Sequence, residues 1–396
     1  MNIDDPIITS MLDDDLYKFS MGAVVFHKFP HLEVSYGFIN RGNIQFPPGF
    51  AIELKKQLKH LSNVKMTPEE LRWLKDLPYI RPTYAEWLYG FQYDPEDVHI
   101  DQAGGSLIEW FAGPWYKQIL WEVKLMAIKS ELYFRMTGHK MARDWQERIV
   151  KKANDLEDSN CQWADMGTRR RRSLDVQNEV VGVMKNFKGF VGTSNPYLAM
   201  KHGVKPMGTS AHEATMVMEC LYGAYKANTK WLDNWYDYYE GKLGIALTDT
   251  YTTPVFLNGM GWKELNAWDG MRQDSGDPYK CGKLIMDHYK SYYVSTDKKT
   301  IVFSDNLNVP KGIHLTNTFR PHFGKVILGI GTNFSNDTFT KEQKAEGQKP
   351  LNMVIKLSGV NVDGKWIGAV KLSDDIGKNT GKPEDIYRVR QALNLV

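Results

Sequence analysis

The chain has 396 residues, of which 42% are hydrophobic and 24% are charged, and its formal net charge is +3. This length suits two ordinary domains, or one large barrel with an additional domain, and the composition excludes a disordered chain. The small and scattered charge gives no reason to expect binding to nucleic acid.

The three cysteines, Cys161, Cys220 and Cys281, lie far apart and form neither a disulfide framework nor a zinc-binding spacing. A reducing cytoplasm is therefore the expected compartment. The first residues lack the basic and apolar segments of a signal peptide, and no apolar run approaches the roughly 18 residues that cross a membrane. We expect a cytoplasmic protein that contacts neither a membrane nor a nucleic acid.

The first 135 residues predict a mixture of helices with one strand. A helix is expected over residues 12–26, with Asp13, Asp14 and Asp15 in its first turn, where acidic side chains favour the helix dipole. Strict alternation predicts a strand over 33–38. Further helices are expected over 54–61, 68–77 and 115–136, the last because its apolar residues recur at three-to-four spacing.

Residues 140–340 show short apolar runs that alternate with helical patterns. The runs centre on Phe190, Pro206, Ala246, Arg272, Val302 and Ile327. The helical patterns cover 196–202, 212–225, 255–268, 278–289 and a short stretch after Asn306. This alternation predicts parallel strands with crossover helices, although the uneven spacing does not predict a regular eightfold barrel.

The C-terminal part begins with a strand-rich segment at 352–357. The Gly- and Lys-rich tail beyond it is expected to fold back onto the N-terminal part. Residues 341–350 combine charge with loop-forming residues and are expected to form an exposed loop.

Each apolar run of the middle region ends in small polar or charged residues. These ends are the segments 192–195, 208–213, 248–250, 272–277, 304–306 and 329–333. In βα barrels the loops that follow the strands converge on one face, which holds the chemistry. One polar strand end is an ordinary turn, but six in succession with carboxylates and a histidine predict a shared active site.

His212 is the most informative of these residues, because it lies just past a predicted strand and at the start of a predicted helix. The free backbone N–H groups of a helix start attract phosphate. An imidazole beside them can accept a phosphoryl group as a nucleophile. The alternative is a histidine that only caps the helix.

Arg272 and Asp274 form the second candidate pair. A strand-end arginine beside an aspartate can bind a sugar phosphate together with a ribose or a metal ion, whereas the alternative is an ion pair that closes a turn before a Pro-initiated helix. Gly329 and Gly331 follow another apolar run. Their backbone can approach and cradle a phosphate, although the same pattern marks any tight turn.

The unbroken arginine run at 169–172 is the third candidate. Four adjacent side chains cannot share one face of a helix, so we expect at least two of them to be solvated. One or two could bind a carboxylate or phosphate through paired hydrogen bonds, and an RNA-binding strip is the rival interpretation. Tyr17 and Phe19 lie in an amphipathic segment where core packing is the default. The histidines other than His212 form no metal-binding pair.

These motifs together resemble the nicotinate phosphoribosyltransferase family. The similar segments, in chain order, are Asp15–Phe19, 167–171, 192–195, 208–213, 249–251, 272–277, 304–305 and 329–332. The resemblance implies an irregular α/β barrel of the type II phosphoribosyltransferase kind over residues 139–349. It implies an α+β domain built from residues 1–138 and 350–396.

The resemblance also implies a reaction and its participants. Nicotinate and phosphoribosyl pyrophosphate would give nicotinate mononucleotide and pyrophosphate, coupled to hydrolysis of ATP and assisted by Mg²⁺. His212 would be the phosphorylated histidine, while Arg272 and Asp274 would contact the phosphoribosyl group or its metal. No sequence motif for direct metal ligation is present.

The remaining roles are also carried over from the resemblance. The ribose and its 5′-phosphate would be held by Ser304, Asp305, Gly329, Gly331 and Thr332. The pyridine would lie beside Arg169, Met166, Thr193 and Ser194, with Arg169 at its carboxylate. Tyr17 would stack on the ring from a second subunit, which implies a homodimer.

Met166 is a departure from the family pattern, because a phenylalanine usually stands there. A thioether can still pack against an aromatic face. The nearest rival is a nicotinamide-using relative, which places an acid in the ring pocket, whereas the run from Thr193 to Asn195 is neutral and favours nicotinate. A dianionic quinolinate would need more basic strand ends, and a non-catalytic RNA-binding barrel is the remote alternative.

Overall fold

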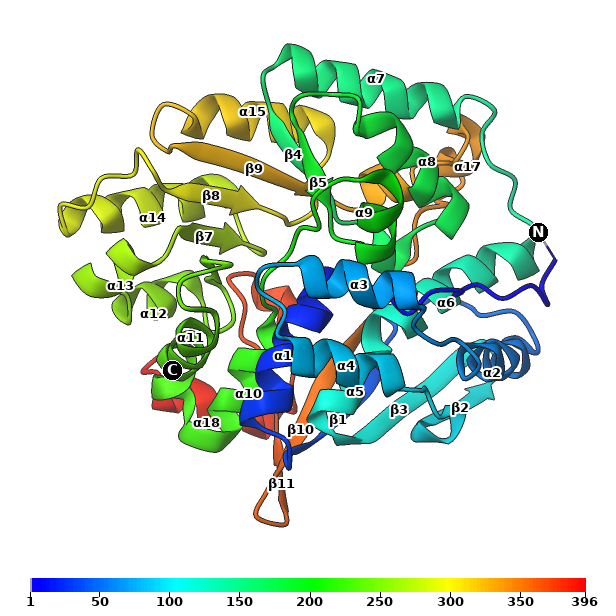
Figure 1. Cartoon of the computed structure of the whole chain (residues 1–396), viewed down its shortest axis with the longest axis horizontal. Coiled ribbons are helices and arrows are strands. Elements are labelled where there is room, and N and C mark those ends of the chain that lie inside the picture. Colours follow the sequence, from blue (N-terminus) through cyan, green and yellow to red (C-terminus); the bar gives the residue numbers. More distant parts are fainter. Residues whose placement is uncertain (1) are drawn as a thin grey trace.

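The computed structural model describes residues 2–396 and contains two β-sheets with helices packed around them (Figure 1). The five-stranded sheet has the order β11-β10-β1-β3-β2 and antiparallel pairing. The six-stranded sheet has the order β5-β4-β9-β8-β7-β6 and parallel pairing. The predicted fold class, an α/β barrel beside an α+β part, is confirmed.

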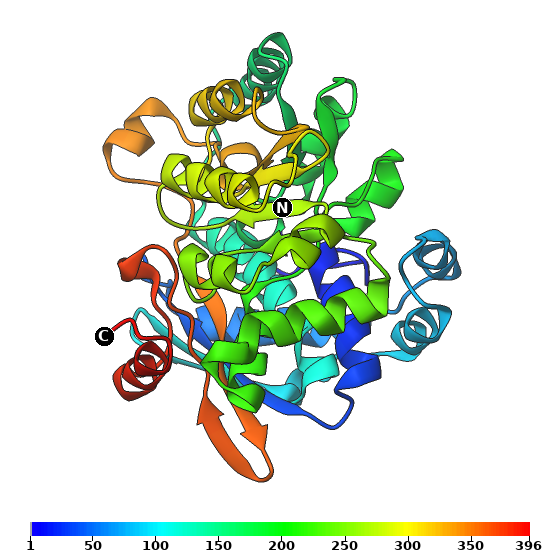
Figure 2. The same cartoon turned by 90° about the vertical axis from the view of Figure 1, so that its left-hand side faces the viewer.

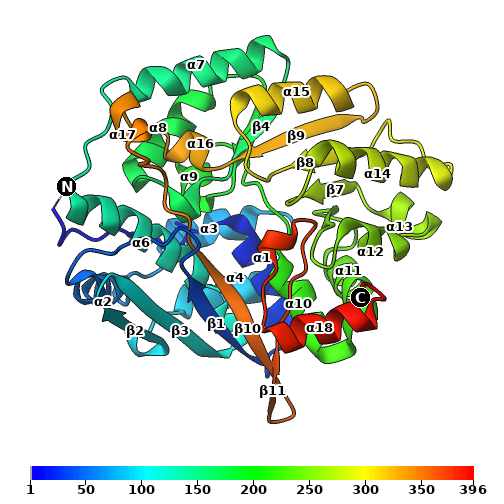
Figure 3. The ribbon, with the colours of Figure 1, turned by 180° about the vertical axis from the view of Figure 1, so that it is seen from behind.

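The antiparallel sheet joins the two ends of the chain. Its strands are β1 (Glu33–Ile39), β2 (Val98–Ala103), β3 (Ser106–Pro114), β10 (Val354–Val362) and β11 (Lys365–Gly368). Val34 of β1 lies opposite Val360 of β10, so the tail folds back as expected (Figure 3). The hairpin of β10 and β11 projects from this sheet (Figure 2). In β3 the buried Phe111 follows the exposed Trp110, which is the alternation of a sheet with one covered face.

The parallel sheet carries the strand ends predicted to form a site. Its strands are β4 (Gln162–Asp165), β5 (Phe190–Thr193), β6 (Ile245–Leu247), β7 (Gly270–Gln273), β8 (Thr300–Phe303) and β9 (Lys325–Ile330). All four residues of β8 are buried, as expected for a strand covered on both faces. Because every strand runs the same way, their carboxyl ends meet at one edge.

The strand expected at Pro206 is wrong, and its place is taken by a single bridge to Thr193 at the edge of β5. Proline has no N–H to donate to a strand ladder, so pairing stops there. A few residues on, the Thr209 hydroxyl donates to the Ile245 carbonyl of β6 at the opposite edge. The segment therefore spans the two edges of the sheet and makes the barrel irregular.

The N-terminal helices are α1 (Leu16–Lys28), α2 (Phe50–Leu61), α3 (Pro68–Asp76), α4 (Pro82–Gly90), α5 (Trp115–Gln118) and α6 (Trp121–Thr137). The aspartates expected in the first turn of α1 precede it instead, and that expectation is wrong. Asp13 is buried against Arg171, and Asp14 is buried 3.3 Å from Lys124. Pairing with buried cations outweighs the weaker attraction of a helix start.

The later helices surround the parallel sheet and the C-terminal strands. They are α7 (Trp145–Asp158), α8 (Leu174–Met184), α9 (Pro196–His202), α10 (His212–Tyr222), α11 (Ala224–Tyr239), α12 (Thr253–Asn258), α13 (Trp262–Ala267), α14 (Pro278–Ser291), α15 (Val309–Phe319), α16 (Thr332–Ser335), α17 (Lys341–Ala345) and α18 (Pro383–Ala392). Two helices expected as single pieces, over 115–136 and 255–268, are each divided in two. Gly259 and Gly261 separate the second pair, where a flexible backbone ends a helix.

The sequence patterns did not predict several elements, notably β2, β3, β4, α7 and α8. Residues 341–350 are largely exposed as expected, but they include the short helix α17 with a capping box at Thr340. Among residues 2–396, no helix combines the length and the apolar character that a membrane crossing requires.

Candidate active site

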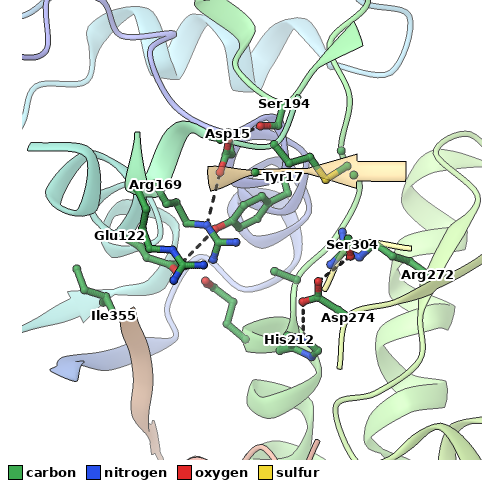
Figure 4. A pocket seen from close by; sticks show the side chains of 18 of the residues that line it. Asp15, Tyr17, Glu122, Arg169, Ser194, His212, Arg272, Asp274, Ser304 and Ile355 are labelled. Carbon is green, nitrogen blue, oxygen red and sulfur yellow. Dashed lines mark hydrogen bonds and ion pairs between the residues drawn. The ribbon is translucent and has the colours of Figure 1, made fainter. Parts of the chain in front are cut away.

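One cavity lies at the carboxyl ends of the parallel strands, where β10 and the start of α1 face them (Figure 4). Eleven of the residues predicted for the site line it: Tyr17, Met166, Arg169, Ser194, His212, Arg272, Asp274, Ser304, Gly329, Gly331 and Thr332. The expectation that successive strand ends share one site therefore agrees with the geometry.

His212 begins α10, and its ring is held from both nitrogens. Nδ1 lies 3.0 Å from the Thr250 hydroxyl, while Nε2 lies 3.0 Å from Lys371 Nζ and 3.2 Å from Asp274 Oδ2. Burial and the Lys371 ammonium lower the pKa of His212 to about 4, against the opposing pull of Asp249 and Asp274. The ring is therefore neutral at pH 7 and can act as a nucleophile.

Asp274 connects His212 to the strand ends on the far side of the cavity. Its Oδ1 accepts a hydrogen bond of 2.6 Å from the Ser304 hydroxyl, and its Oδ2 faces His212. Burial would raise the pKa of Asp274, but His212, Arg272 and Lys371 hold it well below its ordinary value. Within residues 2–396 the buried Nε of Arg272 has no hydrogen-bond partner, which leaves a donor for an anionic ligand.

The glycine turn after β9 requires residues without a side chain. A Cβ on Gly329 would lie 2.5 Å from Met166 Sδ, and one on Gly331 would lie 2.9 Å from the Met166 carbonyl oxygen. Met166 thus packs directly on the turn, and its N–H donates to the Ile330 carbonyl. The glycines let the backbone approach both Met166 and a ligand closely.

A second group of side chains, which we call the base subsite, consists of Asp15, Tyr17, Glu122 and Arg169. The Tyr17 hydroxyl donates to Glu122 over 3.3 Å. The guanidinium of Arg169 lies 3.8 Å from both Asp15 and Glu122. These distances exceed hydrogen-bond length, and within residues 2–396 Arg169 donates no hydrogen bond, so its donors face the cavity unused.

Tyr17 lines the cavity of its own chain, with Arg169 and Glu122 beside it. Tyr17 therefore contributes to the cavity of its own chain, and its entry into the site of a second subunit stays a prediction. The local reason for its place in this cavity is that α1 begins beside β5, where the Leu16 N–H donates to the Ser194 carbonyl.

The arginine run differs from expectation in its burial. Arg171 is fully buried and donates to both carboxylate oxygens of Asp13, at 2.6 and 2.7 Å. Arg172 is also buried, with its guanidinium 4.0 Å from the centre of the Phe134 ring. Arg169 and Arg170 line the cavity. No RNA-binding strip is formed, because the four side chains point into the protein or its cavity.

Two predicted residues do not line the cavity. Thr193 is fully buried and donates to Asp165 over 2.7 Å, so it supports the strand end from behind. Asp305 pairs with Lys378 at 2.8 Å, and Asn306 takes the place beside the cavity. Successive strand residues point to opposite faces, which explains why Ser194 lines the cavity while Thr193 does not.

Several cavity residues were missed by the sequence analysis: Asp15, Glu122, Arg170, Asn306 and Lys356. Burial lowers the pKa of Lys356 to about 8, with nearby cations acting in the same direction and Glu122 opposing them. Lys356 was detectable as the one charge in the apolar run 353–357. Glu122 gave no such signal, because α6 carries several buried charges.

No group of three or more His, Cys, Asp or Glu side chains that could hold a metal ion occurs among residues 2–396. The donor set nevertheless fits magnesium bound with a substrate. Mg²⁺ is commonly held by one or two carboxylates together with substrate phosphates and water. Asp274, whose side chain is 31% exposed in the cavity, supplies one such carboxylate.

Comparison with known proteins gives a consistent result. A model of the "Nicotinate phosphoribosyltransferase (NAPRTase) family" matches residues 161–395, and a model of that family's N-terminal domain matches residues 12–130. A nicotinate phosphoribosyltransferase of Chromohalobacter salexigens is 40% identical over 98% of this chain and 99% of its own. One of Desulforapulum autotrophicum is 41% identical over 98% and 99%.

Comparison with solved structures indicates the same family. The crystal structure of nicotinate phosphoribosyltransferase from Porphyromonas gingivalis superposes with a TM-score of 0.94 at 34% identity, covering 98% of this chain and 100% of that one.

Proposed function

The chain belongs to the nicotinate phosphoribosyltransferase family and is an enzyme, and we propose how its cavity divides the work of that reaction. Phosphoribosyl is transferred from phosphoribosyl pyrophosphate to the nitrogen of nicotinate, giving nicotinate mononucleotide and pyrophosphate for NAD salvage. ATP hydrolysis is coupled to this transfer through a phosphohistidine at His212. The observation that carries the proposal is one cavity lined both by the unused donors of Arg169 and by the cluster of His212, Arg272 and Asp274.

The base subsite holds nicotinate by its carboxylate. A guanidinium presents a planar fork that matches a carboxylate, and Arg169 keeps this fork free. The Tyr17 ring lines the same cavity and supplies an aromatic face, and Met166, which packs against the glycine turn, also lines it. The pyridine nitrogen then faces the sugar-binding side of the cavity.

The strand ends hold the phosphoribosyl group. Arg272, the turn at Gly329 and Gly331, and Thr332 bind its phosphates and ribose with their donors. The reacting carbon passes through a cation-like transition state as pyrophosphate departs, so catalysis depends mainly on charge stabilisation. Asp274 would hold Mg²⁺ together with the diphosphate, and the ion would neutralise the leaving group.

His212 accepts the γ-phosphoryl group of ATP in this proposal. Its neutral imidazole has a lone pair to offer, and the Lys371 ammonium at 3.0 Å can stabilise a phosphoryl group placed on the ring. Transfer forms an N–P bond and releases ADP. Water later cleaves that bond and releases phosphate, which couples ATP hydrolysis to the phosphoribosyl transfer.

A nicotinamide-using activity is the second candidate, because Asp15 and Glu122 line the base subsite and could accept from an amide. The run at 193–195 is neutral, as the sequence shows, but these two acids reach the subsite from other parts of the chain. Arg169 still favours the acid substrate, since it lies 3.8 Å from both acids and its donors stay free to bind a substrate carboxylate.

The deciding experiment measures mononucleotide formation from nicotinate and from nicotinamide, with and without ATP. The proposal requires nicotinate to be the better substrate and ATP to raise the yield of product. Preference for nicotinamide would overturn the substrate assignment. An unchanged yield without ATP would overturn the coupling.

Assembly and compartment are further proposals. A homodimer remains a prediction, and because Tyr17 and Arg169 of one chain line the same cavity, we expect activity per chain not to fall on dilution. Light scattering combined with the assay tests this. The three cysteines are free and buried, which is compatible with the expected reducing cytoplasm.

A further inference from the structure

Two acids flank Arg169, the arginine that we assign to an anionic base. Glu122 reaches Arg169 from the start of α6, and Asp15 reaches it from the residue before α1 (Figure 4). Both side chains are nearly buried, with 8% and 5% exposed, and both face a cavity whose substrate is itself negatively charged. Acids in this position oppose substrate binding, so their presence needs a physical reason.

Glu122 is also anchored from behind by a buried lysine. Lys18 is fully buried, and its ammonium lies 2.6 Å from Glu122 and 2.5 Å from Glu213. Glu213 in turn accepts from Tyr36 and Trp115, so its position is fixed. Burial would raise the pKa of Glu122, but Lys18, Arg169 and Lys356 lower it to about 2, and the side chain is ionised at pH 7.

Lys18 cannot serve as a second binding site for substrate carboxylates. It has no exposed surface, and the two glutamates occupy its charge. Within the base subsite the single charge of Arg169 is set against two acids, and another cation that lines the cavity is Lys356. One carboxylate can use the free fork of Arg169, whereas a second carboxylate on the same ring would meet Glu122 or Asp15, and Lys356 already lies in the field of Glu122.

We propose that Glu122 is a specificity-determining residue that limits the base subsite to a ring with a single carboxylate. It offsets the charge of Arg169 enough to reject a pyridine dicarboxylate, while the paired hydrogen bonds of Arg169 still hold a monocarboxylate. This inference rests on the proposed nicotinate site.

If Glu122 has this role, its removal should change the affinity for a ligand more strongly the more negative charge that ligand carries. Replacing the ionised Glu122 by a neutral glutamine makes the net charge of the subsite more positive by one unit. Solvent around the partly exposed guanidinium of Arg169 screens part of this change. The variant Glu122→Gln should bind the nicotinate monoanion about three- to tenfold more tightly, and the quinolinate dianion by about the square of that factor. The affinity for neutral nicotinamide should change by less than about twofold.

The experiment measures the KM for nicotinate and the competitive inhibition constants of quinolinate and nicotinamide, at saturating phosphoribosyl pyrophosphate. Thermal unfolding of each variant is recorded first. Glu131→Gln is the matched control, because Glu131 lies on the same helix and pairs with Arg135 at 2.6 Å, but does not line the cavity. This control variant should change the KM for nicotinate and the two inhibition constants by the same factor, or leave all three unchanged.

Asp15→Asn provides a second test, because Asp15 flanks Arg169 from the other side and should show the same order of effects. Raising the ionic strength should shrink the differences between variant and wild type. Equal changes for all three ligands, or weaker binding of quinolinate, would overturn the inference. Wild-type enzyme that makes no nicotinate mononucleotide would instead overturn the proposed function, so the two failures are distinguishable.

Discussion

Lys371 and His212 lie 159 residues apart in the chain, yet Nζ of the lysine is 3.0 Å from Nε2 of the histidine. An ammonium only donates, so Nε2 accepts when it pairs with Lys371, and the ring proton is then on Nδ1, 3.0 Å from the Thr250 hydroxyl. Pairing with Asp274 Oδ2, 3.2 Å from Nε2, requires the other tautomer, with the proton on Nε2. Lys371 also lies 3.4 Å from Asp249, which keeps the lysine in place. The C-terminal segment therefore sets the protonation state of a residue at the barrel edge.

The variant Lys371→Met tests this control. The lysine lowers the pKa of His212, so its removal should raise that pKa from about 4 toward the ordinary value. The acidic limb of the ATP-coupled rate should move to higher pH by about one unit, because the ring would be protonated earlier on acidification. A pH profile of ATP hydrolysis measures the shift. An unmoved limb would show that Lys371 does not act on His212.

The same pKa shift affects stability. A histidine whose pKa is lower in the folded than in the unfolded protein contributes fully to the free energy of unfolding at pH values above its unfolded pKa near 6.5. That contribution is lost as the pH falls toward the folded pKa of about 4. In Lys371→Met this loss should begin at a similar pH but be smaller. Denaturant unfolding between pH 7 and 4 measures it.

His212→Ala should abolish ATP coupling and leave slower transfer without ATP, because the imidazole is not the acceptor of the ribosyl group. Wild-type protein treated with γ-labelled ATP should carry an acid-labile, base-stable label that the variant lacks. His314→Ala is the control, since His314 is exposed and bonded to Tyr279. The phosphohistidine assignment is wrong if the His212→Ala protein still hydrolyses ATP in step with product formation.

The sequence predicts those site residues that can be recognised from their immediate neighbours in the chain. His212, Arg272, Asp274 and the glycines stand directly after apolar runs, and the carboxyl ends of parallel strands meet at one edge. Asp305 has the same kind of position, but its side chain pairs with Lys378 away from the cavity, and only the side-chain direction could reveal this.

The missed residues belong to elements that reach the site through tertiary packing. Lys356 and Lys371 come from beyond residue 350, and Glu122 comes from a helix that the sequence predicts only from the three-to-four spacing of its apolar residues. Their distance from the strand ends in sequence is large, so no spacing rule connects them. The buried ion pair of Arg171 was not predicted for the same reason, since its partner Asp13 precedes α1.

Arg169→Lys should weaken nicotinate binding more than it weakens turnover. A lysine keeps the charge but cannot form two parallel hydrogen bonds with a carboxylate. Loss of one charged hydrogen bond costs about 1.5–3 kcal/mol, so KM for nicotinate should rise about 10- to 100-fold. Steady-state kinetics with nicotinate as the varied substrate measure the change. A kcat that falls while KM stays constant would contradict this role.

Gly331→Ala should lower the affinity for phosphoribosyl pyrophosphate. The added Cβ would lie 2.9 Å from the Met166 carbonyl, so the turn must move away from its ligand-binding position. Gly37→Ala is the matched control, because a Cβ there meets no atom within 4 Å. The KM for phosphoribosyl pyrophosphate should rise several-fold in the first variant and stay unchanged in the control. Equal behaviour of the two variants would argue against a phosphate-binding turn.

Asp13→Asn should destabilise the fold without touching the cavity. Asp13 and Arg171 are both fully buried, and the guanidinium donates to both oxygens of the carboxylate. Breaking a buried pair leaves an uncompensated charge and costs about 3–5 kcal/mol in the free energy of unfolding. Asp155→Asn is the control, because its pair with Lys151 is largely exposed and should contribute little. Denaturant unfolding at pH 7 measures both variants, and a cost for Asp13→Asn no larger than that of the control would show that Gln177 can hold the arginine unaided.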